Sequence, residues 1–175
     1  MELHHEQRYV SDIAYARNIP VELKLHPQAT VSCAEKAALL HWDVSRIVKA
    51  LYYHTGDYAN LIGIITPETG PLDSTKIFMS ALHLDKKAAK RYNANGFMPS
   101  GMSKGTCTPF PKESVLQSEI SHLIILDKPA LDDMIVDISV GDEFPEPFKV
   151  SMHLPYRGIY EILSNRFGSD IVRRA

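Results

Sequence analysis

The chain has 175 residues, of which 45% are hydrophobic and 23% are charged. These shares exclude a disordered chain, and the length predicts a single domain over 1–175. The formal net charge of −2 excludes a uniformly basic nucleic-acid-binding protein but not a local basic patch. No apolar run reaches the roughly 20 residues of a membrane-spanning helix, and the polar amino terminus gives no secretory signal. Cys33 and Cys107 form neither a CxxC motif nor a disulfide framework, so we expect a cytoplasmic protein without a membrane partner.

The predicted elements begin with a strand over 21–25, in which apolar and polar residues alternate. Pro27 ends this strand, because proline cannot donate a hydrogen bond to a ladder. Ser32 and Glu35 then have the spacing of a capping box, which predicts a helix that runs to about His41.

Two runs rich in β-branched and aromatic residues follow at 46–53 and 60–66, and a turn is predicted between them at 54–57. Two strands joined by a short turn favour an antiparallel pair. The rest of the chain predicts two helices at 75–83 (capped by Asp73 or Ser74) and 85–92, followed by an irregular segment at 93–113. Three strands are then predicted at 122–126, 134–139 and 148–154. A closing helix is predicted from Pro155 to Phe167. The sum is an α+β fold with one mostly antiparallel mixed sheet and flanking helices.

Lys49 lies in the middle of the apolar run 46–53. Side chains alternate along a strand, so Lys49 shares one face with Ile47 and Leu51, while the other face is also apolar. The strand is therefore predicted to be central, where an ammonium group loses hydration unless an anion compensates. Three interpretations stay open: a lysine at a cleft rim with its head in water, a site for a phosphate or carboxylate, and a Schiff-base lysine.

The segment 101–110 combines glycines with hydroxyl residues inside the irregular stretch 93–113. Irregular segments of this length in compact domains are usually functional or disordered. Gly101 and Gly105 permit positive φ and close backbone approach, so the loop can aim amide N–H groups at a carbonyl or phosphate oxygen. It carries neither GxxxxGK[ST] nor GxGxxG, which excludes a P-loop and a dinucleotide-binding loop.

The eight histidines show no HExxH motif and no Cys/His ligand spacing, so we expect no metal and no cofactor. Cys107 is a candidate nucleophile without an identifiable base, and a small, partly buried thiol is the alternative. Five basic residues against one acidic residue make 85–104 positive, whereas seven acidic residues against one basic residue make 127–146 negative. The basic stretch leads into the Gly-rich loop, which suits a ligand with several phosphates, such as an RNA end.

The order of these features resembles the YbaK-like family, which is related to the editing insertion domain of bacterial prolyl-tRNA synthetases. The matching pieces span most of 15–165, and the chain differs from the common pattern at Ala50, where family members carry threonine. The pieces are His26-Pro27 with Thr30 and Ser32, 34–38, 47–51, Leu72-Asp73, Gly101, 105–110, Asp127 and 139–141.

The resemblance implies a compact domain that hydrolyses the ester of wrongly charged aminoacyl-tRNA without a metal, a cofactor or a catalytic triad. It implies that Lys49 holds phosphate or ribose at the tRNA 3′ end, and that the amides of Gly101 and Gly105 lie near the aminoacyl carbonyl. The terminal ribose hydroxyl is expected to assist. The expected substrate-binding residues are Thr106, Cys107 and Thr108 at the pocket or the attacking water, and His26 and Thr30 at the amino-acid cavity.

The sequence thus predicts a free-standing deacylase that acts on mischarged tRNA, with tRNA-Pro as the expected substrate and an aminoacyl-tRNA synthetase as a further partner. Two alternatives stay open. One is a binding module that holds a tRNA end, a nucleotide or a peptide in the same cleft without catalysis. The other is a small-molecule hydrolase with Cys107 as its nucleophile.

Overall fold

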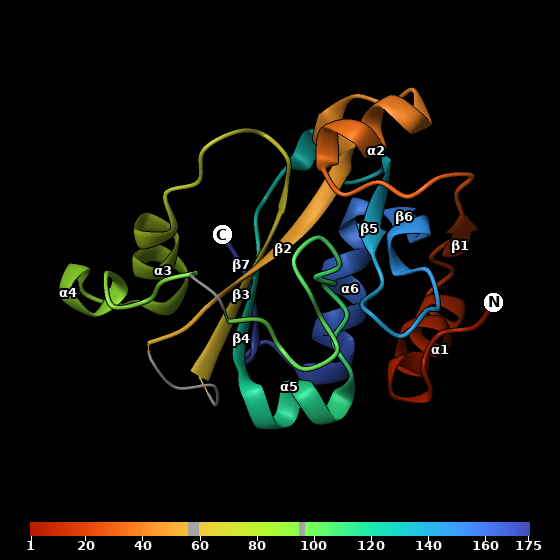
Figure 1. Cartoon of the computed structure of the whole chain (residues 1–175). Coiled ribbons are helices and arrows are strands. Elements are labelled where there is room, and N and C mark those ends of the chain that lie inside the picture. The colour runs from red at the N-terminus through yellow and green to blue at the C-terminus, as the bar shows by residue number, and fades with distance from the viewer. Residues whose placement is uncertain (56–59, 95–96) are drawn as a thin grey trace.

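The computed structural model describes residues 1–55, 60–94 and 97–175, and these form one sheet with helices on both faces (Figure 1). The helices are α1 (Arg8–Ala16), α2 (Cys33–Leu40), α3 (Ser74–Leu82), α4 (Lys86–Ala89), α5 (Glu113–Glu119) and α6 (Tyr156–Phe167). The strands are β1 (Glu22–Leu25), β2 (Ile47–Tyr53), β3 (Leu61–Pro67), β4 (Ile120–Ile125), β5 (Ile135–Ser139), β6 (Val150–Pro155) and β7 (Val172–Arg174). No helix within these ranges has the length and apolar character needed to cross a bilayer.

The strands lie in the order β1-β6-β5-β2-β3-β4-β7, with β2 in the middle of the sheet. β1–β6, β5–β6 and β2–β3 pair antiparallel, whereas β2–β5, β3–β4 and β4–β7 pair parallel. The α+β class, the mixed sheet and the central place of the Lys49 strand are therefore confirmed. Parallel pairing is more extensive than the sequence suggests, because β3 and β4 are joined by a long crossover that carries three helices rather than by a hairpin turn.

Each of the six predicted strands is present within two residues of its expected bounds, and β2 and β3 form the expected antiparallel pair. The predicted helix over 85–92 is shorter, because α4 ends after one turn and the chain returns to pair Asn93 with His54. The predicted turn at 54–57 and the irregular segment 93–113 lie partly outside the described residues, at 56–59 and 95–96. Helices α1 and α5 and strand β7 have no counterpart among the predicted elements.

The capping box of α2 forms with one difference from the ideal pattern. Ser32 Oγ accepts a hydrogen bond from Glu35 N at 3.1 Å, as expected. The Glu35 carboxylate accepts from Val31 N at 2.8 Å, one residue further back than the cap itself. His41 ends the helix in the left-handed region at φ 54°. These contacts fix the start of α2, which borders the cavity described below.

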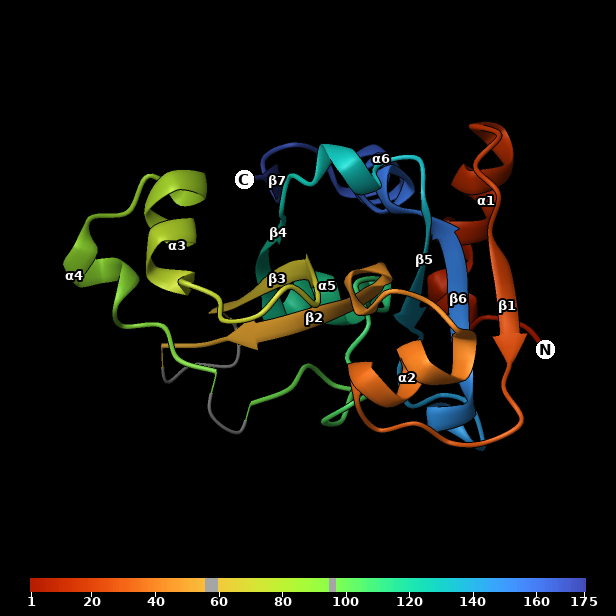
Figure 2. The ribbon, with the colours of Figure 1, turned by 90° about the horizontal axis from the view of Figure 1, so that it is seen from above.

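The two faces of the sheet are covered by different helices (Figure 2). One face carries the larger apolar cluster and packs against α1 and α6. The opposite face, called the site face below, carries Ile47, Lys49 and Leu51 of β2. Helix α2 covers one part of the site face, and α3 covers another, where Phe78 joins the smaller apolar cluster with Ile64. The part between these helices holds a cavity.

Candidate functional site

A cavity of about 290 Å³ lies on the site face, with β2 as its floor. Four segments that are distant in sequence supply its walls: the start of α2, strand β5, the Gly-rich loop and the chain just before β6. Its lining residues are Thr30, Val31, Ser32, Cys33, Lys36, 47–52, Ala94, Met98, Lys104, Gly105, Cys107, Asp137, Ser139, Pro147, Phe148 and Val150.

Lys49 lies on the floor of this cavity and is paired with a carboxylate. Its Nζ donates a hydrogen bond to Glu68, and the two side chains are 28% and 26% exposed. The hydrogen bond from Lys49 lowers the pKa of the Glu68 carboxyl, against the opposing effect of burial. The ammonium is therefore neither fully desolvated nor out in bulk solvent, and it keeps a counter-ion that an incoming anion must displace or share.

Glu68 is a site residue that sequence reasoning missed. The register of β2 and β3 pairs Lys49 with Thr66, and Glu68 N donates to Ile47 O at 2.9 Å. Glu68 is thus the diagonal neighbour of Lys49 on the same face of the sheet. With 46–53 and 60–66 paired as antiparallel strands and Lys49 opposite Thr66, Glu68 is the next residue along on the face of Lys49.

The Gly-rich loop needs its glycines for two reasons. Gly101 and Gly105 have φ of +79° and +93°, a region that side chains rarely adopt. A Cβ on Gly105 would also lie 3.0 Å from Phe148 Cε1, on the wall of the cavity. Gly105 lines the cavity, whereas Gly101 lies at the base of the loop, where its carbonyl accepts a hydrogen bond from Asp142 N at 2.9 Å.

Asp142 clamps this loop through its side chain as well. Ser103 Oγ donates to Asp142 Oδ2 at 2.5 Å, and Thr106 Oγ1 donates to Asp142 Oδ1. Ser103 N in turn donates to Thr106 Oγ1 at 3.0 Å. Thr106 is only 1% exposed and lies outside the lining of the cavity. One residue of the acidic stretch 127–146 therefore holds the loop in shape.

The other two predicted loop residues differ in position. Thr108 is buried, with its hydroxyl accepting from Phe110 N at 3.1 Å and its carbonyl accepting from Tyr52 Oη at 2.8 Å. Cys107 lines the cavity, and its Sγ lies 3.1 Å from Met98 Sδ. Burial, with a smaller contribution from a nearby carboxylate, raises the pKa of Cys107 to about 11. Its thiol is therefore protonated at neutral pH and is a weak nucleophile.

Of the predicted site residues, the cavity brings together Lys49, Gly105, Cys107 and Thr30. Gly101, Thr106 and Thr108 lie outside the lining and form hydrogen bonds that hold the loop in place. His26 is buried beside the cavity, and its Nε2 is 2.6 Å from Ser151 Oγ.

A buried polar cluster surrounds Asp137, which lines the cavity from β5. Asp137 Oδ2 accepts from Ser151 Oγ at 2.5 Å and lies 2.9 Å from His153 Nε2 and 3.7 Å from His26 Nε2. Lys36 Nζ lies 3.9 Å from Asp137 Oδ1. Burial works to raise the pKa of Asp137, but these polar neighbours together hold it at about 2. The carboxylate is ionised at neutral pH.

The atoms of His26, Asp137 and His153 that could ligate a metal ion lie within 4.8 Å of one another. The Ser151 hydroxyl, however, is within hydrogen-bond distance of both His26 Nε2 and Asp137 Oδ2, and the Lys36 ammonium already supplies positive charge beside the carboxylate. A hydrogen-bonded network accounts for this geometry without a cation.

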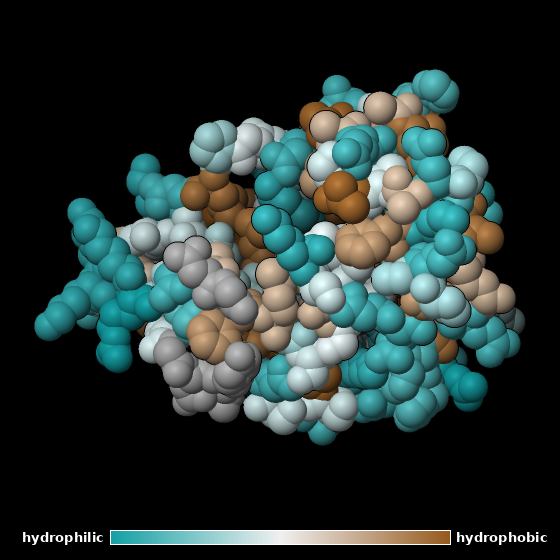
Figure 3. All heavy atoms as spheres, viewed as in Figure 1, coloured by the Kyte–Doolittle hydropathy of each residue, from teal (hydrophilic) through white to brown (hydrophobic). Residues whose placement is uncertain are grey.

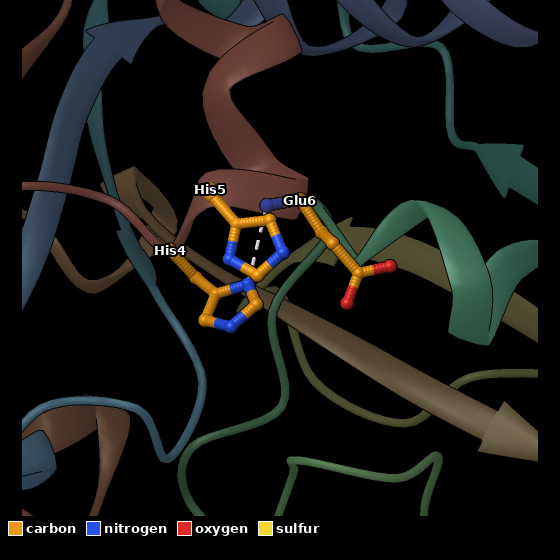
Figure 4. Close-up of side chains that lie close together, drawn as sticks. All are labelled: His4, His5 and Glu6. Atoms are coloured by element: carbon orange, nitrogen blue, oxygen red, sulfur yellow. Dashed lines mark hydrogen bonds between the residues drawn. The ribbon is translucent and has the colours of Figure 1, made fainter.

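A second group of potential ligands, His4, His5 and Glu6, lies near the amino terminus (Figure 4). His4 Nδ1 accepts a hydrogen bond from Glu6 N at 3.2 Å, and the Glu6 carboxylate accepts from Ser114 N at 3.0 Å. In Figure 4 the carboxylate points away from the imidazole rings. The group therefore joins the amino-terminal segment to α5.

The basic stretch 85–104 gives α4 a hydrophilic surface, visible at the left of Figure 3. Lys86, Lys87 and Lys90 form no ion pair with any residue in the described part of the chain. Lys104, at the other end of the stretch, is exposed and lines the cavity. Among the residues that the structure describes, positive charge without an ion-pair partner therefore lies both at α4 and at the cavity.

Solved structures of other proteins share this fold. A structure described as hypothetical protein APE2540 matches with a TM-score of 0.61 and 21% identity, over 94% of this chain and 96% of that one. A structure described provisionally as a trans-editing enzyme for prolyl tRNA synthetase matches with a TM-score of 0.54 and 14% identity, over 92% and 93%. A structure from epitope grafting onto scaffold proteins by computational design matches with a TM-score of 0.52 and 18% identity, over 99% of this chain and 96% of that one. Neither a protein-family model nor a curated protein matches the sequence. At these identities the likeness shows a common fold.

Proposed function

We propose that the chain is a free-standing aminoacyl-tRNA deacylase, a single YbaK-like domain over 1–175 that hydrolyses the ester of mischarged tRNA-Pro in the cytoplasm. One observation carries this proposal: the Lys49 ammonium and the Gly105 turn line one cavity. The fold shared with a structure described provisionally as a trans-editing enzyme supports it.

In the proposed reaction, water adds to the ester carbonyl, the bond to the ribose oxygen breaks, and a free amino acid and the tRNA 3′ hydroxyl leave. Lys49 holds phosphate or ribose of the terminal adenosine, with Lys104 as a second cation at the cavity. Backbone amides of the loop around Gly105 stabilise the charge that develops on the carbonyl oxygen. The ribose hydroxyl assists the attacking water, as the resemblance implies.

The state of the cysteines argues against the thiol-hydrolase alternative. Burial raises the pKa of Cys33 and of Cys107, and neighbouring carboxylates raise both further. Catalytic thiols have lowered pKa values, because the thiolate is the reactive species. Electrostatic positioning without a protein nucleophile fits the cavity better.

The test is single-turnover deacylation of tRNA-Pro charged with alanine, cysteine or serine. We expect Lys49→Ala and Lys49→Gln to slow hydrolysis by about 100-fold, because a substrate that is not held in position loses about that much in rate. The glutamine variant keeps a hydrogen-bond donor beside Glu68, so it separates the loss of charge from the loss of a partner. Lys24→Ala, at a partly exposed lysine of β1 that pairs with Glu22, is the matched control and keeps the wild-type rate.

Circular dichroism establishes that each variant is folded. Wild-type rates in both Lys49 variants would remove the mechanism. Tight binding of tRNA by wild-type protein without hydrolysis of any charged form would favour the non-catalytic binding module instead.

A further inference from the structure

One wall of the cavity carries polar groups that the proposed reaction leaves unused. Thr30, Lys36 and Asp137 all line the cavity and are 6%, 9% and 2% exposed. In an apolar pocket, buried polar groups of this kind are expected to have hydrogen-bond partners. Here their hydrogen-bonding capacity is only partly satisfied.

The hydroxyl of Thr30 is the clearest case. Its backbone N–H donates to Phe148 O at 3.1 Å, which fixes the residue beside the cavity wall. Its Oγ1 has no hydrogen-bond partner among the described residues. A buried hydroxyl without a partner is costly, so a bound ligand is the natural group to satisfy it.

Lys36 and Asp137 face each other without forming a hydrogen bond. The 3.9 Å between Lys36 Nζ and Asp137 Oδ1 exceeds hydrogen-bond distance. Asp137 Oδ2 is occupied by Ser151 and His153, which leaves Oδ1 as the oxygen on the Lys36 side. The pair therefore offers one donor and one acceptor close together.

The sheet fixes the distance between this wall and Lys49. Asp137 of β5 pairs with Ile47 of β2, so Asp137 and Lys49 are diagonal neighbours on the site face. Diagonal neighbours in a sheet lie roughly 7–8 Å apart. A terminal adenosine held at Lys49 would thus place its aminoacyl group within reach of Lys36 and Asp137.

We propose that Thr30, Lys36 and Asp137 form a polar subsite that selects aminoacyl groups with a hydroxyl on the side chain, such as seryl and threonyl, over alanyl and valyl. This inference rests on the proposed function. A hydroxyl donates to Asp137 Oδ1 and accepts from Lys36 at the same time, whereas an apolar side chain leaves the polar groups unpaired.

The experiment compares side chains of matched shape. One tRNA-Pro preparation is charged with serine or alanine, and with threonine or valine, and the ratio of deacylation rates is measured within each pair. We expect the wild-type protein to prefer the hydroxyl member by at least about tenfold. Lys36→Met and Thr30→Val, which keep the size of the side chain, should bring the two rates within each pair close to equality. Lys24→Met is the control and keeps the wild-type preference for the hydroxyl member of each pair.

A second measurement makes the two proposals separable. Seryl- and alanyl-adenosine with a 3′-amide linkage cannot be hydrolysed as esters, and calorimetry gives their affinities directly. If no charged tRNA is hydrolysed but the seryl compound still binds more tightly in a Lys36-dependent way, the deacylase proposal fails and the subsite stands. Equal rates within each pair together with equal affinities, or a preference that survives both variants, would overturn the subsite.

Discussion

At the scale of single residues, Asp137 shows how a buried acid stays charged. Burial alone would favour its neutral form, but Ser151 and His153 contact one oxygen, His26 lies 3.7 Å from that oxygen, and Lys36 lies 3.9 Å from the other. These groups favour the ionised form and hold its pKa at about 2, below the ordinary value of 3.8. Because protons bind more weakly in the folded state, the ionised carboxylate stabilises the fold.

This linkage predicts how stability depends on pH. The contribution of Asp137 is fully present above pH 4 and is lost as pH falls toward 2, with a size of about 2 kcal/mol. Asp137→Asn should lower the free energy of unfolding at pH 7 by a similar amount and should flatten its decline between pH 4 and pH 2. Urea unfolding across this range measures both. The exposed acid Asp12 supplies the control, Asp12→Asn, whose curve should follow the wild type. Parallel curves for the Asp137 variant and the wild type would contradict the assignment.

At the scale of elements, the Gly-rich loop depends on a contact outside itself. Asp142 accepts hydrogen bonds from Ser103 and Thr106 and donates its N–H to Gly101 O, so it holds the first half of the loop, 101–106, together. Hydrogen bonds to a charged acceptor contribute more than neutral ones, although partial exposure weakens them. The conformation of the turn at Gly105 therefore depends on the segment after β5.

Removing this clamp should affect activity more than stability. We expect Asp142→Ala to lower the free energy of unfolding by about 1–2 kcal/mol. Deacylation should fall by at least about tenfold, because the loop amides lose their alignment with the carbonyl. Asp142→Asn keeps an acceptor and should retain more activity than alanine does. Glu146→Ala, at an exposed glutamate paired with Lys149, should match the wild type. An alanine variant with normal turnover would show that the clamp is irrelevant to the site.

The local elements could be predicted from sequence because their signals are local. Alternation predicted the strand at 21–25, and runs of β-branched and aromatic residues predicted those at 46–53 and 60–66. Ser32, Asp73 and Asp85 marked helix starts that the structure confirms. The missed helix α1 also carries a helical pattern, since Tyr9, Val10 and Ala14 are its buried residues.

The site was only partly predictable, because its parts meet through pairing between distant strands. Asp137 and Ser139 alternate with apolar residues on β5, and Ser151 and His153 do the same on β6, which marks polar positions on one face. Nothing local says that β5 pairs in parallel with β2, which places Asp137 beside the Lys49 strand. Lys36, in turn, has the sequence appearance of a solvated helix residue.

At the scale of the whole molecule, charge is separated although the net charge is small. Helix α4, at one end of the molecule (Figures 1 and 3), carries Lys86 and Lys87, and Lys90 follows directly after it. Lys104 lines the cavity. A strand of RNA that enters the cavity and extends toward α4 would release counter-ions from these positions.

Affinity for tRNA should therefore fall as salt rises. On a plot of log affinity against log salt, we expect a negative slope that becomes shallower by about 0.7–0.9 for each phosphate contact removed. The triple variant Lys86→Ala, Lys87→Ala and Lys90→Ala tests this in filter-binding titrations between low and physiological salt. Lys24→Ala, on the edge strand, should leave the slope unchanged. A flat salt response in the wild type would argue against a nucleic-acid partner.

The register between β2 and β5 also fixes the distance between two positions in the cavity. Lys49 and Asp137 are attached to adjacent strands joined by backbone hydrogen bonds, so loop movements cannot change the spacing between them. The opposite wall includes the Gly-rich loop, whose shape depends on hydrogen bonds to Asp142. In a substrate longer by one methylene between its ribose and the end of its side chain, the terminal group would extend past Asp137 when the ribose is held at Lys49. Length discrimination would then be a property of strand geometry, and engineering it would require a change of register rather than a change of loop.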